Sequence, residues 1–335
     1  MTETERVAHV GEDGLLARIF PLLPAGDATL LGPGDDAAVL AAPDGRVVVS
    51  TDVLVEGRHF RRDWGTGEDL GWRAAAQNLA DVAAMGARPT AIVVGLVLPA
   101  DAEVAWVLGL ARGLAAACAP HGVGVVGGDL TGGSEVVVAV TVHGDLEGRA
   151  PVRRDGARPG DTLALAGTVG RAAAGLALLE AGVSSSWSDD GTPPTAVGPA
   201  GLVASYLRPT PPLAAGPAAA LAGAHAMLDV SDGLLRDASR VAWASGVLID
   251  VDTAALAHLT EALEPAATAL DADQLTWVLT GGEDHGLLAA FPAGAELPEG
   301  FVVVGRVLEA AGEPGVLVDG RAPEGTTGWD HFGGA

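Results

Sequence analysis

The sequence contains no lysine: all 19 of its basic residues are arginine. This absence excludes ATP-binding sites that rely on a Walker A lysine or a protein-kinase strand lysine, and it excludes Schiff-base chemistry on lysine. Cys118 is the only cysteine, so the chain can form neither an intrachain disulfide nor a zinc site built from cysteines. Several large classes of catalyst are therefore excluded from the start.

Basic residues are also few relative to acidic ones. The sequence has 19 arginines and 43 aspartates and glutamates, which gives a formal net charge of −24 and a pI of about 4.4. Such a surface repels nucleic-acid phosphates and anionic membranes. The sequence has no uncharged apolar run of the roughly 20 residues that a membrane helix requires, and no signal-peptide pattern at its start. We therefore expect a cytoplasmic protein that binds neither nucleic acid nor membrane.

Short apolar runs and longer helical patterns alternate along the chain, which indicates a layered α/β (α+β) architecture. The length of 335 residues suggests two domains. A polar, turn-rich segment over 145–160 predicts a boundary between domains 1–148 and 149–335, and the Ser/Pro/Gly-rich segment 183–201 predicts a surface loop. Strands are expected at 46–52, 91–98, 123–129, 135–142, 162–166, 226–232, 286–291 and 301–307, and helices at 69–85, 102–119, 171–181 and 234–244.

Aspartates recur where these patterns predict turns and strand ends. They follow a Gly-Pro-Gly turn at Asp35–Asp36, end the apolar run that contains Ser50 and Thr51, and follow two glycines at Asp129. Taken singly, the first two motifs favour an exposed turn and a capped strand end. The glycines before Asp129 allow a ligand to approach the backbone closely, because no Cβ intervenes.

Two further acidic motifs lie on or beside helices. Asn78 and Asp81 are three residues apart and share one helix face, where a solvated acid and a half-buried functional acid are equally consistent with the pattern. The segment Asp229–Gly233 leads directly into a helix. There Ser231 or Asp232 would be either an ordinary N-cap or part of a phosphate-binding helix start.

The acids are more informative as a set than singly. Carboxylate oxygens are the ligands of hard cations such as Mg²⁺, which usually binds one or two carboxylates together with substrate phosphates. If these acidic side chains converge in the fold, they would hold several Mg²⁺ ions against a polyphosphate. The bound ions would let an acidic, lysine-free protein bind a nucleotide. The acids concerned are Asp36, Asp52, Asp81, Asp129, Asp229 and Asp232.

Eight motifs in series closely resemble the bacterial thiamine-monophosphate kinase family, over nearly the whole chain from Gly32 to Phe332. They are GPGDDAAVL, VSTDVLVEGRHF, NLADVAAMGARP, VVGGD, RRDGARPGD, LDVSDGLLRD, LTGGEDHGL and GWDHF. The resemblance implies the two-domain fold of the aminoimidazole ribonucleotide synthetase superfamily. It also implies an N-terminal ATP- and Mg²⁺-binding domain that forms a homodimer through its strands, and a C-terminal domain that completes the active site.

The resemblance also implies a role for individual residues. The magnesium positions are Asp36, Ser50, Thr51, Asp52, Asp81, Asp129, Asp229 and Asp232. The ATP contacts are Gly128, Asp129, Arg154 and Ser231, and the thiamine-phosphate contacts are His59, Glu283 and Trp329. Among these, Asp52, Asp129 and Arg154 are expected to act on the transferring phosphoryl group. Without the family, Trp329 and Glu283 would be interpreted as a packing residue and a turn acid.

Three positions depart from the family pattern. Leu130 replaces a frequent threonine, Arg158 replaces a usual lysine, and Gly286 follows His285 where the family commonly has an aromatic residue and then glutamate. The expected reaction converts ATP and thiamine monophosphate into ADP and thiamine diphosphate, with Mg²⁺ ions as cofactors. The alternatives are another ATP-activating enzyme of the superfamily and a non-catalytic, metal-dependent nucleotide-binding module.

Overall fold

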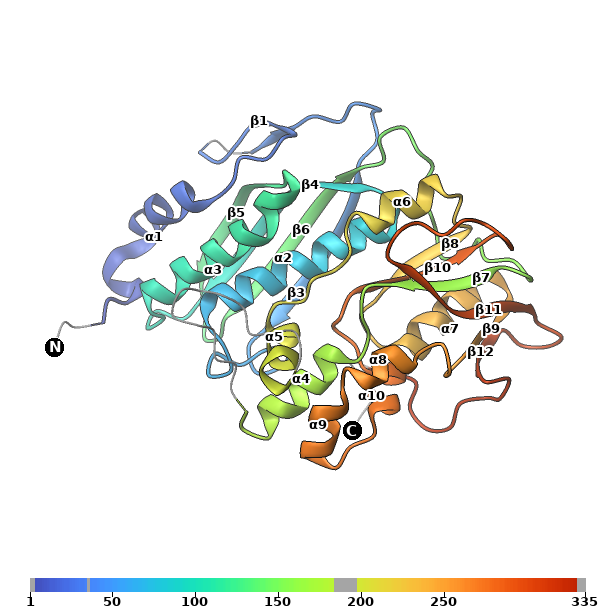
Figure 1. The fold of residues 1–335 in the computed structure, drawn as a ribbon. Helices are drawn as coiled ribbons and strands as arrows, with labels where there is room; N and C mark the ends of the chain where they lie inside the picture. The colour runs from blue at the N-terminus through green and yellow to red at the C-terminus, as the bar shows by residue number, and fades with distance from the viewer. Residues whose placement is uncertain (1–3, 35–36, 184–197, 330–335) are drawn as a thin grey trace. The chain divides into compact units, whose positions relative to one another are not determined.

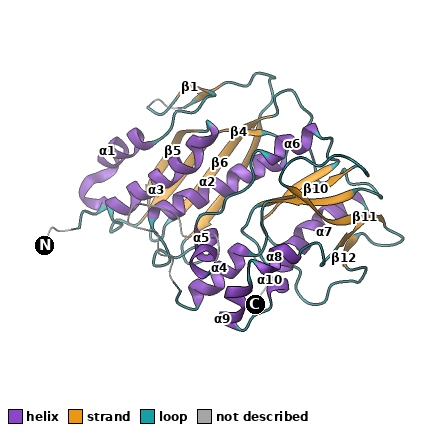
Figure 2. Cartoon of the chain, in the orientation of Figure 1, coloured by secondary structure: helices purple, strands orange, loops and turns teal. Residues whose placement is uncertain are grey.

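The computed structural model describes residues 4–34, 37–183 and 198–329, which form two compact units. The first unit comprises Met1–Val82 and Arg88–Gly148, and the second comprises Ala83–Ala87 and Arg149–Ala335. Residues 83–87, which the sequence assigns to the first domain, therefore belong to the second unit. Each unit combines one principal sheet with several helices, which confirms the predicted α/β class (Figures 1 and 2).

The first unit is built on a four-stranded sheet in the order β3-β6-β4-β5. Strands β4 and β5 are parallel, and the other pairs are antiparallel. The sheet strands are β3 (Val48–Val55), β4 (Arg88–Leu98), β5 (Gly124–Gly132) and β6 (Val137–Asp145), beside a hairpin of β1 (Thr29–Leu31) and β2 (Val39–Leu40). The helices are α1 (Val7–Ile19), α2 (Gly67–Ala84) and α3 (Val104–Cys118), with 3₁₀ turns at Phe20–Leu22 and Ala119–His121.

Helices α2 and α3 cover one face of this sheet (Figure 1). Side chains alternate accordingly: Val138, Val140 and Val142 of β6 are buried, whereas Val49 and Val53 of β3 are 61% and 47% exposed. Because strand side chains point to opposite faces in turn, each strand contributes to both surfaces. Within the described residues of this unit, the core thus lies on the helix-covered face, and the opposite face, called the open face below, carries these exposed valines.

Glycines let α2 and α3 pack backbone to backbone. A Cβ at Gly71 of α2 would lie 2.0 Å from the Leu110 carbonyl oxygen of α3, and a Cβ at Gly113 would lie 2.0 Å from the Glu68 carbonyl oxygen. Only residues without a side chain allow this approach. The close packing fixes the position of α2 over the sheet.

Helix α3 includes most of the segment Val104–His121, which is long and apolar enough to cross a membrane by length and composition. Half of that segment is buried within the protein. Val107, Leu110 and Leu114 are buried in the core of the first unit. The apolar composition of α3 is thus explained by its core position.

The second unit is built on a six-stranded sheet in the order β12-β9-β11-β7-β10-β8. Only the β12–β9 pair is parallel. The strands are β7 (Thr162–Ala166), β8 (Ala226–Val230), β9 (Val247–Val251), β10 (Gly286–Phe291), β11 (Phe301–Glu309) and β12 (Gly315–Val318). The helices are α4 (Arg171–Glu180), α5 (Pro199–Leu207), α6 (Ala215–Leu221), α7 (Leu234–Ser245), α8 (Ala257–Glu261), α9 (Glu264–Leu270) and α10 (Gln274–Thr280).

Strands β8 and β10 are buried along their whole length, so the loops at their ends are held by the core of the second unit. Strand β8 leads through Ser231–Gly233 into α7, and α10 leads through Gly281–His285 into β10. Because β8 and β10 are antiparallel neighbours, the end of β8 lies beside the start of β10. The two acidic motifs of this unit are therefore brought together by the sheet.

Candidate functional site

Four of the polar positions singled out in the sequence meet between β3 and α2. Ser50 Oγ donates a hydrogen bond to Asp81 Oδ2 at 2.7 Å, and the backbone N–H of Asp52 donates to Asn78 Oδ1 at 3.2 Å. Gln77 Nε2 also donates to Asp52 Oδ2, at 3.3 Å. The shared helix face of Asn78 and Asp81 is confirmed. The result is an oxygen-rich group that contains two carboxylates.

Thr51 lies on the opposite side of the same strand. Its Oγ1 donates to the carbonyl oxygen of Val140 at 2.9 Å and accepts a hydrogen bond from Thr141 Oγ1 at 3.1 Å. Alternation along β3 therefore separates Thr51 from the side chains of Ser50 and Asp52. His59, in the turn after β3, accepts a hydrogen bond at Nδ1 from the Val55 backbone N–H at 3.0 Å, so its ring is held locally.

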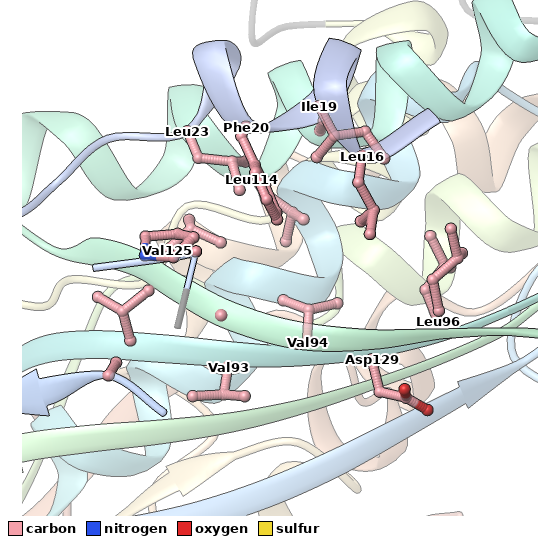
Figure 3. Close-up of a pocket in the computed structure, with 18 of the residues that line it drawn as sticks. Leu16, Ile19, Phe20, Leu23, Val93, Val94, Leu96, Leu114, Val125 and Asp129 are labelled. Atoms are coloured by element: carbon pink, nitrogen blue, oxygen red, sulfur yellow. The ribbon is translucent and has the colours of Figure 1, made fainter. Parts of the chain in front are cut away.

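A cavity of about 530 Å³ opens beside Gly127, Gly128 and Asp129 in the first unit (Figure 3). Its lining is mostly apolar and comes from α1, α3, β4, β5 and the segment around Gly34. A Cβ at Gly128 would lie 2.0 Å from the Val94 carbonyl oxygen, so this position requires glycine. Two of the predicted nucleotide motifs, the one around Gly34 and the one around Gly128, thus border one cavity.

The sheet register places Asp52 and Asp129 on opposite faces. Asp52 pairs with Val140, Val140 with Val94, and Val94 with Gly128, and paired residues point to the same face of a sheet. Asp129 follows Gly128 in β5, so its side chain points to the other face. Figure 3 shows Asp129 on the far side of the strands from Leu16 and Leu114. Both aspartates also lie inside longer strands than expected, the fifth residue of β3 and the sixth of β5. The expected strand-end positions were wrong, and the sheet itself does not bring these two acids together.

In the second unit, Asp229 is a buried residue of β8, and Asp232 lies in the turn before α7. Neither Ser231 nor Asp232 is the N-cap of this helix, which is Gly233. Instead, the backbone N–H groups of Ser231 and Asp232 donate to Asp237 Oδ2, at 3.1 and 2.9 Å. Of the two alternatives left open by the sequence, the N-cap is therefore wrong, because a first-turn aspartate accepts from these backbone groups.

Arg240 binds two of these acids at once. It forms an ion pair with Asp232 at 2.6 Å and a second one with Asp237, one helical turn before it. Burial raises the pKa of Asp237 to about 6, and the hydrogen bond from the Asp232 backbone and the charge of Arg240 act in the opposite direction. The turn is therefore fixed by charges that the unit itself supplies.

The Gly281–His285 loop is attached to the end of β8 by its backbone. Glu283 N–H donates to the Ser231 carbonyl oxygen at 2.8 Å, and His285 N–H donates to that of Val230 at 3.1 Å. Glu283 and His285 both adopt left-handed φ values, of 70° and 55°. Such strain in residues with side chains persists where the surroundings impose it, and it is concentrated at functional sites.

Asp284 anchors this loop from inside the core. Its carboxylate accepts hydrogen bonds from Thr168 Oγ1 at 2.9 Å and from the Ala172 backbone N–H at 3.0 Å. Burial raises the pKa of Asp284, against the effect of these donors. Beside it, His285 Nδ1 lies 3.1 Å from Asp229 Oδ2, and His285 Nε2 lies 3.9 Å from Glu283 Oε2. The loop thus joins two predicted site residues through one ring.

The remaining predicted positions are more exposed. Trp329 donates its backbone N–H to the Asp232 carbonyl oxygen at 2.9 Å, and its side chain is 59% exposed. Arg154 is exposed, and its carbonyl oxygen accepts a hydrogen bond from Ser245 Oγ at 2.9 Å. Asp36 and most of the expected loop 183–201 lie outside the described residues. Within the described ranges, no group of three or more histidine, cysteine, aspartate or glutamate side chains is arranged to hold a metal ion.

Sequence reasoning missed Asp237, Arg240, Asp284 and the role of His285. The spacing of Asp237 and Arg240, three residues apart in the first turns of α7, was a usable signal for an ion pair. Nothing comparable marks His285, because its two partners come from different parts of the chain. Only the pairing of β8 with β10 brings them within reach.

Comparison with known proteins identifies close relatives. Residues 34–146 match the family described as AIR synthase related protein, N-terminal domain, and residues 158–317 match its C-terminal domain. A thiamine-monophosphate kinase from Mycobacterium tuberculosis (strain ATCC 25618 / H37Rv) is 47% identical over 99% of this chain and 95% of its own length. Among solved structures, thiamine-monophosphate kinase from Stenotrophomonas maltophilia K279a matches with a TM-score of 0.76 and 33% identity, over 93% of this chain and 96% of that one. AaThiL complexed with AMPPCP and TMP has the same TM-score at 32% identity, over 99% and 100%.

Proposed function

The chain belongs to the thiamine-monophosphate kinase family, and we propose that it transfers the terminal phosphoryl group of ATP to thiamine monophosphate, giving ADP and thiamine diphosphate. The names of its relatives and the two ligands of the AaThiL structure support these substrates. The observation that carries the proposal is the cavity beside Gly127–Asp129, where two motifs of the family border one space.

The cavity suits a nucleotide. Its walls are mostly apolar side chains from α1, α3 and β4, which is the environment that an adenine base fills. Because Gly128 has no side chain, a ligand can approach the backbone closely at this edge of the cavity. We assign the base to this cavity and the phosphates to the glycine-rich edge, with Asp129, Arg154 and Ser231 as further ATP contacts.

The acceptor has different requirements. The thiazolium ring of thiamine monophosphate is a fixed cation, which an aromatic face or a carboxylate attracts. The exposed indole of Trp329 and the carboxylate of Glu283 have this chemistry. We assign these two residues and His59 to the thiamine phosphate.

Mg²⁺ is the cofactor that this chemistry requires, and the residues between β3 and α2 fit it. Ser50, Asp52 and Asp81 offer oxygen atoms, the donors that Mg²⁺ prefers, and their hydrogen bonds described above come from neutral side chains. In the second unit, Asp229 has the same chemistry, whereas Asp232 is already paired with Arg240. We propose Asp36, Thr51 and Asp129 as further ligands; because Thr51 and Asp129 lie on the opposite face of the sheet from Asp52, they would hold a different ion.

The reaction needs positioning rather than a general base. The acceptor is an ionised phosphate, so no proton has to be removed to make a nucleophile. Bound Mg²⁺ supplies charge neutralisation between the two polyanions. The aspartates named above hold it there, Arg154 adds positive charge, and the cavity orients the nucleotide. We therefore propose direct in-line transfer without a phosphorylated enzyme.

We also propose that the enzyme is a cytoplasmic homodimer. The open face of the first-unit sheet carries Val49, Thr51 and Val53 from β3, of which the valines are 61% and 47% exposed. A second copy of this chain is the occupant that such an apolar, strand-built face suits. Sedimentation velocity on Val53→Lys is expected to show a shift from dimer to monomer, and a wild-type monomer would contradict the proposal.

The function is tested by following ADP release with and without thiamine monophosphate. Release that requires the acceptor, with thiamine diphosphate identified by mass spectrometry, is the expected result. ADP release that is independent of the acceptor would indicate another ATP-activating enzyme. Nucleotide binding without turnover under either condition would indicate a binding module, and both results would overturn the proposal.

A further inference from the structure

One imidazole ring in the second unit contacts two acids to which the proposed function gives different roles. His285 is 4% exposed. Its Nδ1 lies 3.1 Å from Asp229 Oδ2, and its Nε2 lies 3.9 Å from Glu283 Oε2. An ionised carboxylate only accepts hydrogen bonds, so Nδ1 carries the proton and donates it to Asp229. The ring therefore forms a hydrogen bond with Asp229, whereas Glu283 lies beside Nε2 at a distance too long for a hydrogen bond.

The backbone determines where this ring lies. His285 N–H is bonded to the Val230 carbonyl oxygen, and the preceding residue, Asp284, is buried and bonded to Thr168 and Ala172. The left-handed φ of 55° at His285 costs free energy for any residue with a Cβ. Because anchors on both sides impose this conformation, the ring's location does not depend on its contacts with Asp229 and Glu283.

We infer that His285 is a positioning residue that orients the Asp229 carboxylate through a hydrogen bond from Nδ1 and whose ring forms a wall beside the Glu283 side chain. The inference rests on the proposed function, in which Asp229 holds Mg²⁺ and Glu283 contacts thiamine monophosphate. A carboxylate that ligates a metal needs a further hydrogen bond to fix its orientation. His285 supplies that bond to Asp229, and the same ring restricts where the Glu283 side chain can lie.

The second unit contains a matched control for this arrangement. His225 Nδ1 lies 3.0 Å from both carboxylate oxygens of Asp161, which also accepts the Arg158 backbone N–H at 2.8 Å. Asp161 is buried like Asp229, but it is assigned to neither substrate nor metal. Substitutions at His225 therefore report the structural cost of losing a histidine–aspartate contact in this unit.

The test compares His285→Asn and His285→Phe with the same changes at His225. Asparagine keeps a donor near the Nδ1 position, loses Nε2, and tolerates left-handed backbone. Phenylalanine keeps the ring and loses both contacts. For each variant we would measure the melting temperature, the binding of Mn²⁺ by electron paramagnetic resonance in the presence of AMPPCP, and KM and kcat with thiamine monophosphate.

We expect His285→Phe to weaken Mn²⁺ binding by about 10- to 100-fold, the usual cost of removing a hydrogen bond behind a metal ligand. We expect His285→Asn to keep Mn²⁺ binding near the wild-type value and to raise KM for thiamine monophosphate, because the ring beside Glu283 is lost. The His225 variants should change only the melting temperature.

Wild-type Mn²⁺ affinity and wild-type KM in both His285 variants would overturn the inference. So would equal losses at His285 and His225, because these would indicate packing alone. If His285→Phe does not fold, His285→Asn decides through its split between Mn²⁺ binding and KM. If the wild-type enzyme releases no ADP in response to thiamine monophosphate, the proposed function fails, and the Mn²⁺ titrations still test the contact with Asp229.

Discussion

The two acidic groups of the molecule are held in opposite ways. Between β3 and α2, Asp81 accepts a hydrogen bond from Ser50, and Asp52 accepts one from Gln77. At the end of β8, the partners are basic: Arg240 pairs with Asp232 and Asp237, and His285 contacts Asp229. In the contacts described above, the donors to the first group are a hydroxyl and an amide, and the partners of the second are side chains that carry or can carry positive charge.

This difference separates two ways of preparing a site for a polyanion. Hydroxyl and amide donors orient a carboxylate without adding positive charge, so the contacts from Ser50 and Gln77 are compatible with a cation bound beside Asp81 and Asp52. In the second group Arg240 already compensates part of the charge, so its geometry is set by the fold itself. We therefore expect Mg²⁺ binding to depend chiefly on the first unit, and the positioning of thiamine monophosphate to depend chiefly on the second.

The largest effect is expected from Asp52→Asn in the first group. The variant keeps the shape and the contact with Gln77 but removes one negative charge from the group. We expect kcat/KM to fall on the order of 10²- to 10³-fold, the usual cost of losing one electrostatic contact to a reacting group. The melting temperature should stay near the wild-type value, because the shape of the side chain and the contact with Gln77 are kept. Steady-state kinetics and calorimetry would measure both, and near-normal activity would refute the metal assignment.

A second prediction concerns the helix that carries Asp81. In Gly71→Ala the new Cβ would lie 2.0 Å from the Leu110 carbonyl oxygen, so α2 and α3 must move apart. We expect a loss of about 1–3 kcal/mol in the free energy of unfolding, typical of overpacking, measured by urea denaturation. Gly109→Ala in α3 is the control, since its nearest contact would be 3.2 Å. Equal losses of unfolding free energy in the two variants would show that the close packing of α2 against α3 does not fix the position of α2.

The third prediction concerns a variant in which the acidic group at the end of β8 loses its cation and so resembles the group between β3 and α2. Arg240→Gln removes the cation that pairs with Asp232 and Asp237. We expect the free energy of unfolding to fall by about 2 kcal/mol in EDTA, the size of a hydrogen bond to a charged group. Mg²⁺ at ten times its Kd should then restore about 1.4 kcal/mol. Thermal unfolding with and without Mg²⁺ measures this, and a variant that responds to Mg²⁺ no more than the wild type would contradict the comparison.

Much of the fold could be predicted from hydrophobic patterning. Every strand and helix expected from the sequence has a counterpart in the structure, because each is a clear apolar run or helical face. Strand β9 (Val247–Val251) was missed because it follows α7 after a single glycine and includes the buried Asp250, which interrupts its apolar pattern. Strand β12 (Gly315–Val318) was missed because it is four residues long and only half-buried.

The candidate site was less accessible to sequence reasoning. The shared helix face of Asn78 and Asp81 could be predicted from their spacing, whereas their contacts with Asp52 and Ser50 of β3 could not. The opposite faces of Asp52 and Asp129 follow from strand order and register, which no local pattern contains. The bridge through His285 is equally non-local, since it depends on β8 pairing with β10. Sequence patterns thus predict which residue types occur, and the sheet decides which of them meet.

The smallest expected effect concerns the approach to the Gly281–His285 loop. Asp273 caps α10, which leads into that loop, by accepting hydrogen bonds from the backbone N–H groups of Leu275 and Thr276 and from the Thr276 hydroxyl. These donors, the Thr276 hydroxyl first, lower the pKa of Asp273. A carboxylate whose pKa is lower in the folded state stabilises the fold above its unfolded value of about 3.9, and this contribution is lost as the pH falls through the lowered pKa.

We therefore expect Asp273→Ala to cost about 1 kcal/mol at pH 7, the typical loss for a missing N-cap, and less as the pH falls below 4. Asp273→Asn should keep most of the stability at pH 7, because asparagine also caps helices, and should show no such pH dependence at this site. Urea denaturation at pH 7 and pH 3.5 measures both differences. If the stability lost in Asp273→Ala is the same at the two pH values, the negative charge of Asp273 contributes nothing to the stability of α10.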